Sequence, residues 1–394
     1  MAKICILLNG EISNDTRVIN VIKSLSKFHE LDLFYISDVN IDYNVLIFNQ
    51  KVKLYPKKLS NSFIKKIIKN TFFYNEYNFF LREVLNQNVK YDFIYANDLP
   101  CLKPAIKIKK KSGCKVIYDS HEIYIETINQ FFPLQSKFPK NIIFRVLKKI
   151  MKFFGTYAEK RMLKHVDYFI TVGEGLKQYF EKKYNYNGIK IVMNSPYLSM
   201  INEKINYCDI LNNIDKDSFK LLYQGVFNEG RGLRLIMEAM RYTDTRIVLI
   251  LIGYGVLENE LKDLVKKINI QDRVVFLGKI QQNELAKYTA GADCGINLLE
   301  NINKSKELTA PNKLFQYIHA NIPVIASNSF ENKKVFEKYN IGILTNNDVK
   351  SISDAINKIA SMDRTVFVEN CKKAALEYNW ENQEKVLLEI FEDK

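Results

Sequence analysis

Histidine and paired cysteine, which supply most protein metal sites, are scarce in this 394-residue chain. It has four histidines, and its six cysteines are scattered without a CxxC pair. We therefore expect no metal site, and buried, reduced thiols. Long apolar runs are also missing, since no stretch approaches the roughly 20 apolar residues that span a bilayer. The first ten residues lack a positively charged start and a cleavage site, which predicts a strand rather than a signal peptide.

Acidic residues are few in the first half of the chain. Residues 1–196 contain 32 Lys and Arg against 17 Asp and Glu, whereas residues 197–394 contain 26 against 27. An AT-rich genome favours lysine codons, but codon bias should raise the lysine content of both halves equally. The asymmetry predicts an anionic partner for the first half, such as an acidic substrate or an anionic membrane surface. No recognisable nucleic-acid-binding module accompanies the charge, so we expect no nucleic-acid partner.

Apolar strand-like runs alternate with helical periodicity in two successive series. This pattern predicts an α/β fold of two doubly wound, Rossmann-like domains with parallel sheets, in residues 1–196 and 197–377. The expected strands are 4–8, 32–36, 93–96, 115–118, 168–172, 221–223, 247–252, 274–277, 294–298 and 324–326. Residues 380–393 predict a C-terminal helix with one apolar face.

Residues 138–164 interleave basic side chains with aliphatic and aromatic ones at helical spacing. Such a helix could lie in the interface of an anionic membrane, with its apolar face among the lipid headgroups. It could equally be a domain helix with one face in the core and a solvated lysine face. We expect a cytoplasmic protein, peripheral on the inner face of the cell membrane if the first interpretation holds.

Candidate ligand-binding residues follow the predicted strands of the first half. Ligands of parallel α/β sheets bind at the carboxyl ends of the strands. Gly10 permits close backbone approach, and Asn14 or Asp15 then opens a helix, where an N-cap is the simpler role. After the fourth expected strand, His121 stands beside Asp119 and Glu122, which favours a general acid or base or a group that binds sugar hydroxyls.

The second half offers two turns suited to a diphosphate. Gly225 ends a strand and leads to a glycine-rich turn that contains Arg231. A guanidinium binds phosphate bidentately, and glycine exposes backbone N–H groups. Residues 309–313 place Lys313 and backbone amides at the start of another helix, which is again a phosphate-binding arrangement. Gly253 follows a further strand, although a lone GxG is weak evidence.

The runs YQGVFNEGRGL, LIGYG, VVFLGKI and PNKLFQYIHANIPVIAS resemble the GT-B glycosyltransferases and are most similar to glycosyltransferase family 4. The first-half runs NGEISNDTRV, YDSHE and MNSP fit the same family. The resemblance covers nearly the whole chain. It implies two domains facing a central cleft, with the C-terminal helix, 378–394, packed back on the first domain. It also implies transfer of a sugar from a nucleotide-sugar donor, with retention of configuration and no obligatory metal or other cofactor.

By motif matching, Arg231 and Lys313 would hold the diphosphate and stabilise the leaving nucleotide, and His121 would lie near the transferred sugar. The resemblance implies a donor site of Gly10, Gly225, Arg231, Gly253, Lys279, Thr309, Ala310, Pro311, Asn312, Lys313 and Gln316. It implies an acceptor side of Asn14, Asp15, Arg17, Ser120, His121, Glu122 and Asn194. The family often has two Glu where this chain has Leu308 and Gln316, and the Arg that often follows the first glycine is Val226.

These features favour a transferase of bacterial surface glycan assembly that uses a UDP- or GDP-sugar and a glycan or lipid-linked acceptor. A nucleotide-sugar epimerase on the same fold is an alternative, although it leaves the basic first half without a purpose. A catalytically degenerate binding subunit is a second alternative, motivated by Leu308 and Gln316. The donor base, the sugar, the acceptor and the oligomeric state do not follow from the sequence.

Overall fold

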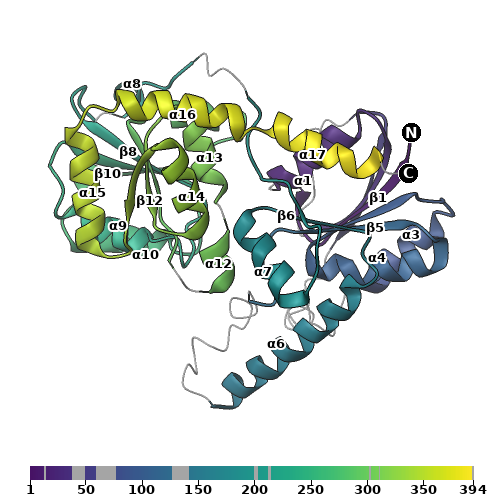
Figure 1. Ribbon diagram of the computed structural model, residues 1–394. Coiled ribbons are helices and arrows are strands. Elements are labelled where there is room, and N and C mark those ends of the chain that lie inside the picture. Colours follow the sequence, from purple (N-terminus) through teal and green to yellow (C-terminus); the bar gives the residue numbers. More distant parts are fainter. Residues whose placement is uncertain are drawn as a thin grey trace. The chain divides into compact units, whose positions relative to one another are not determined.

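The computed structural model describes residues 1–12, 15–37, 49–58, 77–126, 142–198, 203–211, 214–300, 303–309 and 311–392. The chain forms two compact units (Figure 1). The first consists of Met1–Asn194 and Gln383–Lys394, and the second of Ser195–Asn382.

The first unit contains a seven-stranded parallel sheet in the order β3-β2-β1-β4-β5-β6-β7. Its strands are β1 Lys3–Leu8, β2 Glu30–Ser37, β3 Val52–Lys58, β4 Phe93–Asn97, β5 Lys115–Ser120, β6 Tyr168–Thr171 and β7 Lys190–Ile191. Its helices are α1 Thr16–Leu25, α3 Tyr77–Asn86, α4 Asp98–Ser112, α6 Ile142–Leu163 and α7 Glu174–Tyr184.

The second unit contains a six-stranded parallel sheet in the order β10-β9-β8-β11-β12-β13. Its strands are β8 Phe219–Gln224, β9 Ile247–Ile252, β10 Val274–Gly278, β11 Cys294–Asn297, β12 Val324–Ser327 and β13 Gly342–Thr345. Its helices are α8 Tyr207–Ile210, α9 Leu233–Met240, α10 Glu258–Lys267, the short 3-10 helix η4 Gln271–Arg273, α11 Leu285–Ala290, α12 Lys304–Leu308, α13 Asn312–His319, α14 Phe330–Tyr339, α15 Val349–Ser361 and α16 Thr365–Glu377.

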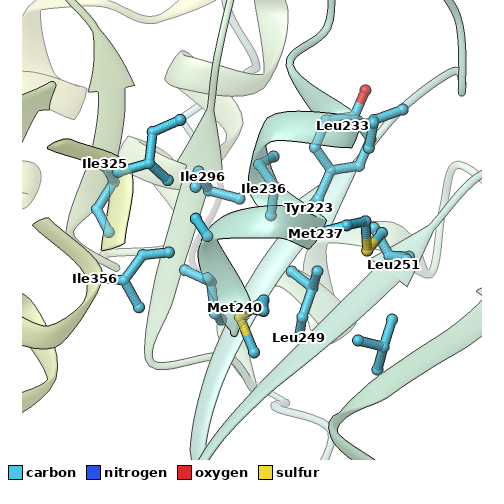
Figure 2. Close-up of a cluster of buried hydrophobic side chains, with 14 of the residues drawn as sticks. Tyr223, Leu233, Ile236, Met237, Met240, Leu249, Leu251, Ile296, Ile325 and Ile356 are labelled. Carbon is cyan, nitrogen blue, oxygen red and sulfur yellow. The ribbon is translucent and has the colours of Figure 1, made fainter. Parts of the chain in front are cut away.

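The prediction of two doubly wound α/β domains is confirmed. In each sheet the chain runs outward from a central strand and then returns to build the other side, so one carboxyl edge collects the loops that follow the strands. Helices cover both faces of such a sheet, and its central strands are therefore apolar throughout. All six residues of β9 are buried. Figure 2 shows how Leu249 and Leu251 of this strand pack with Ile236 and Met240 of α9.

The C-terminal helix α17, Trp380–Glu392, begins in the second unit and continues in the first. The Phe391 ring lies 4.9 Å from that of Phe93, and Glu384 pairs with Lys27 at 2.6 Å. These contacts hold the last turns of α17 to the first unit.

The thiols agree with the expectation from the sequence. All six cysteines are free, and five are buried. Among the described residues, no helix is both long and apolar enough to cross a membrane.

Candidate functional site

The carboxyl edge of the second sheet brings three backbone segments together. The Gly225 amide donates to the Ile252 carbonyl, and the Gly253 amide donates to the Gly278 carbonyl, both at 2.8 Å. A Cβ on Gly253 would lie 1.9 Å from the Gly225 oxygen, so only glycine allows this approach. Glycines thus stand at or directly after the ends of β8, β9 and β10, at Gly225, Gly253 and Gly278.

Lys313, in the first turn of α13, is buried against this edge with 7% of its surface exposed. Its Nζ lies 3.9 Å from the centre of the Tyr223 ring and has no hydrogen-bond partner among the described residues. The same Nζ would lie 3.7 Å from a Cβ on Gly225. Burial lowers the pKa of Lys313 well below its usual value, and the charges of Arg231 and Lys306 lower it further. An anionic ligand would satisfy this ammonium group.

Arg231 lies in the glycine-rich turn between β8 and α9 and is close enough to act on the pKa of Lys313. The turn is held by the Gly232 amide, which donates to Glu300 at 2.9 Å. Arg234, three residues on, binds Glu229 through two nitrogens at 2.6 and 2.8 Å and also pairs with Glu260. Within the described residues Arg231 has no such carboxylate, so it stays available for a ligand.

Gln316 belongs to a chain of side-chain hydrogen bonds at the end of β8. Gln224 Nε2 donates to Gln316 Oε1 at 2.7 Å, and the Thr289 hydroxyl donates to Gln224 Oε1 at 2.8 Å. This arrangement leaves the Gln316 NH₂ group to donate to a ligand. Leu308 is buried and apolar, so its side chain offers a ligand neither a hydrogen-bond donor nor an acceptor.

The remaining residues expected to bind the donor lie near the start of α13 or directly after β10. The Thr309 hydroxyl donates to the Ser305 carbonyl at 2.6 Å, Pro311 precedes the first turn of α13, and Asn312 is exposed in that turn. Ala310 lies outside the described residues. Beyond β10, the Lys279 ammonium lies 5.5 Å from the ring centre of Tyr254, which is exposed.

The carboxyl edge of the first sheet carries a buried ion network instead of a free cation. Arg17 donates from Nε and Nη2 to the two oxygens of Asp119, at 3.0 and 2.7 Å, and a third nitrogen donates to the Val192 carbonyl. The Tyr95 hydroxyl also donates to Asp119, at 2.7 Å. Burial opposes ionisation of Asp119, but Arg17 and then His121 outweigh it and hold its pKa well below the usual range.

His121 lies between two carboxylates of this network. Its Nε2 is 3.3 Å from Asp119 Oδ2, and its Nδ1 is 3.5 Å from Asp98 Oδ2. Burial disfavours the imidazolium, but Asp98 and Asp119 together raise the pKa of His121 to about 9. The second carboxylate that faces the ring is therefore Asp98, and not the Glu122 that adjoins His121 in the sequence.

The remaining residues expected on the acceptor side have local partners. Asp15 caps α1 by accepting from the Val18 amide at 3.1 Å, and Asn194 donates to the Thr16 hydroxyl at 3.2 Å. The Ser120 hydroxyl donates to the Glu122 carbonyl at 3.0 Å. A Cβ on Gly10 would meet nothing within 4 Å, so the backbone there is open to approach. Asn14 lies outside the described residues.

A metal centre finds no support among the residues that the structure describes, where no three His, Cys, Asp or Glu side chains are grouped to hold an ion. Sequence reasoning missed Asp98 and Tyr95, as well as Gln224 and Thr289. Asp98 directly follows β4, so the rule that pointed to His121 could have found it.

Residues 211–377 match the family model described as glycosyl transferases group 1. The matched range lies within the second unit, Ser195–Asn382, and it supports a glycosyltransferase. Arg231, Lys313, Gly225 and Gly253 lie within the matched range, whereas Gly10 and His121 lie in the first unit.

Similar proteins agree with this assignment. Chitobiosyldiphosphodolichol beta-mannosyltransferase of Debaryomyces hansenii is 23% identical over 303 residues, which are 68% of this chain and 61% of that protein. The matches to the curated relatives thus span less than two thirds of the relatives' own lengths. Sucrose-phosphate synthase from Thermosynechococcus elongatus has a TM-score of 0.76 at 16% identity, covering 100% of this chain and 98% of the other. Anabaena HepE, solved with UDP and glucose, has a TM-score of 0.73 at 13% identity, with both chains covered completely.

The buried ammonium group of Lys313 can be tested by its effect on stability. Lys313→Met removes an unsatisfied polar group from an apolar site, so we expect the free energy of unfolding at pH 7 to rise by about 1–3 kcal/mol. Because folding lowers the pKa of Lys313, its cost is present at neutral pH and is lost as the pH approaches the ordinary lysine value of 10.5. Urea unfolding at pH 7 and pH 10 measures both effects.

The control is Lys334→Met on α14, where the side chain is exposed. It should change stability by less than about 0.5 kcal/mol at either pH. A destabilised Lys313→Met protein would mean that the ammonium has a partner in the free protein.

Proposed function

We propose that this protein transfers a sugar from a nucleotide-activated donor to a glycan or lipid-linked acceptor, with retention of configuration, in the manner of glycosyltransferase family 4. The observation that carries the proposal is the pair of cations, Arg231 and Lys313, beside the glycine-rich ends of β8 and β9. Both lack a carboxylate partner in the described part of the chain, and one is buried.

Departure of a nucleoside diphosphate builds negative charge on the oxygen that leaves the sugar. Fixed cations in a water-poor site stabilise such charge at no cost of reorganisation. The proposal gives this role to Arg231, which can bind two oxygens, and to Lys313, which acts as a point charge. Exposed backbone at Gly225 and Gly253 lets the diphosphate approach closely. Gln316 would donate to a hydroxyl of the nucleoside.

The donor is proposed to carry UDP, with GDP as the second candidate. HepE, which shares this fold, was solved with UDP and with UDP-glucose. The exposed Tyr254 ring beside Lys279 offers a flat apolar surface near the strand ends, which suits a nucleobase.

The donor proposal is tested by thermal shift with UDP, GDP, ADP and CMP, followed by incubation with the corresponding nucleotide sugars. We expect the preferred nucleotide to raise the melting temperature of the wild type. Arg231→Ala should lose at least about tenfold in affinity, since one charge-assisted contact contributes about 1.5–3 kcal/mol. Arg241→Ala, an exposed arginine in the same unit that pairs with Glu238, is the matched control.

The outcomes separate the alternatives. No stabilisation by any nucleotide would favour a degenerate binding subunit. Isomerisation or hydrolysis of the nucleotide sugar without an acceptor would favour an epimerase. Transfer that inverts the anomeric configuration would contradict the retaining mechanism and leave the donor site intact.

We further propose that the protein docks peripherally on the inner, anionic face of the cell membrane through α6, where a lipid-linked acceptor of surface polysaccharide assembly would be presented. The buried face of this helix holds Glu159, which accepts from the Tyr118 hydroxyl at 3.0 Å, and Leu163. On the opposite face, apolar side chains are 44–69% exposed at helical spacing: Val146, Leu147, Ile150, Phe153, Phe154 and Tyr157.

Basic side chains border this apolar stripe, among them the exposed Arg145, Lys149 and Lys160. Aromatic and aliphatic groups enter the headgroup region, and neighbouring cations meet anionic lipid. Two exposed adjacent phenylalanines would otherwise be an aggregation hazard on a water-facing helix. These exposed apolar side chains favour the membrane interpretation over that of a domain helix with one face in the core and a solvated lysine face.

A vesicle experiment tests the docking proposal. Phe153→Ser with Phe154→Ser should reduce binding to vesicles of 30% phosphatidylglycerol by at least about tenfold, because roughly 25 cal/mol is lost per Å² of apolar surface no longer buried. Val366→Ser with Leu376→Ser, which changes two equally exposed apolar side chains on α16, is the control. Equal vesicle binding by the α6 variant and the α16 control would exclude α6 as the anchor. Equally strong binding of the wild type to neutral vesicles would exclude a contribution from its basic side chains.

A further inference from the structure

Asp98 has a strained backbone conformation. It is the first residue of α4, and its φ of +60° lies in the left-handed region, which a residue with a Cβ adopts at a cost of about 1 kcal/mol or more. Such strain persists only where the surroundings enforce it. Here the Asp98 carboxylate accepts from the His121 backbone amide at 2.9 Å and faces the His121 ring at 3.5 Å. The strained conformation therefore aims the carboxylate at His121.

Charge balance indicates what this carboxylate does. Asp119 is completely buried, and Arg17 pairs with it through two hydrogen bonds. The addition of Asp98 leaves one negative charge without a counterion in the same network. An imidazolium at His121, which contacts both carboxylates, makes the group of four neutral. Burial raises the pKa of Asp98 and His121 lowers it, so a neutral imidazole would leave Asp98 as a carboxylate without a counterion at a site that disfavours its charge.

We propose that Asp98 is a positioning residue that fixes His121 as an imidazolium at the carboxyl edge of the first sheet, so that His121 acts there as a cation and hydrogen-bond donor and not as a general base. A protonated ring has no free acceptor, so it cannot remove a proton from a hydroxyl. It can stabilise negative charge or donate to a sugar oxygen. The link to catalysis, although not the protonation state, rests on the proposed glycosyl transfer.

Among the described residues, the charged groups that act most strongly on the ring are Asp98 of α4, Asp119 of β5 and Arg17 of α1. The two carboxylates outweigh burial and the repulsion from Arg17, and the pKa of His121 rises to about 9. Because this pKa is raised by folding, the stabilisation from His121 is complete below the unfolded value near 6.5 and is lost as the pH rises through about 9. Activity that needs the imidazolium should fall over the upper part of the same range.

The first arm of the test is histidine NMR on the full-length protein. The chain has only four histidines, so a His121→Gln sample identifies the resonance. We expect a titration midpoint near 9 in the wild type. In Asp98→Asn the midpoint should fall by at least about one pH unit, since one of two carboxylates is lost. Asparagine tolerates the left-handed region, so this variant should keep the backbone. Asp92→Asn, where the carboxylate accepts the Lys3 amide, is the control.

The second arm is the pH dependence of sugar transfer. In Asp98→Asn we expect the alkaline limb of kcat to move to lower pH together with the NMR midpoint, while UDP affinity at the second unit stays unchanged. A His121 midpoint near 6.5 in the wild type would overturn the proposal. So would a lowered midpoint in Asp98→Asn with an unmoved alkaline limb. If the wild type transfers no sugar at all, the proposed function fails, whereas the NMR arm still decides the protonation state.

Discussion

One ammonium group, on Lys313, is buried without a hydrogen-bond partner among the described residues, and the proposed donor site depends on it. Lys313 stands on the first turn of α13, under the carboxyl edge of a sheet in which glycine stands at or directly after three strand ends. Its neighbours in the described part of the chain include the Tyr223 ring and Arg231, and neither offers a carboxylate. The buried charge of Lys313 therefore destabilises the free protein. The diphosphate of the proposed donor would supply the missing charge and hydrogen-bond acceptors and so remove this cost.

The first unit uses its charges in the opposite way. Arg17 is saturated by Asp119 and by a backbone carbonyl, so its contribution is to hold the sheet edge and the residues that follow it. The His121 ring then lies between two carboxylates, those of Asp98 and Asp119. Among the described residues, one unit thus has two cations without a carboxylate partner, and the other has a hydrogen-bonded ion network of fixed geometry. This division matches a protein that binds a charged donor on one domain and positions groups on the other.

The sequence predicted the inner strands of both sheets, because continuous apolar runs such as β9 mark strands buried on both faces. The unpredicted strands are β3, β7 and β13, which all lie at sheet edges. β3 contains a proline and several lysines, β7 has two residues, and β13 has four, so none carries a strong apolar pattern. Arg231 and Lys313 were predicted because glycine and helix starts mark their turns. The roles of Asp98 and Gln224 depend on side chains from distant strands and helices, which spacing along one chain does not reveal.

The most direct test of the central claim is calorimetry of UDP binding at pH 8.5 in buffers of different ionisation enthalpy. The UDP phosphates are fully ionised at this pH, whereas burial lowers the pKa of Lys313 in the free protein, and a bound diphosphate would raise it again. We predict net proton uptake on binding by the wild type and a clear reduction of that uptake in Lys313→Met. Binding without proton uptake, or equal uptake by both proteins, would contradict the account.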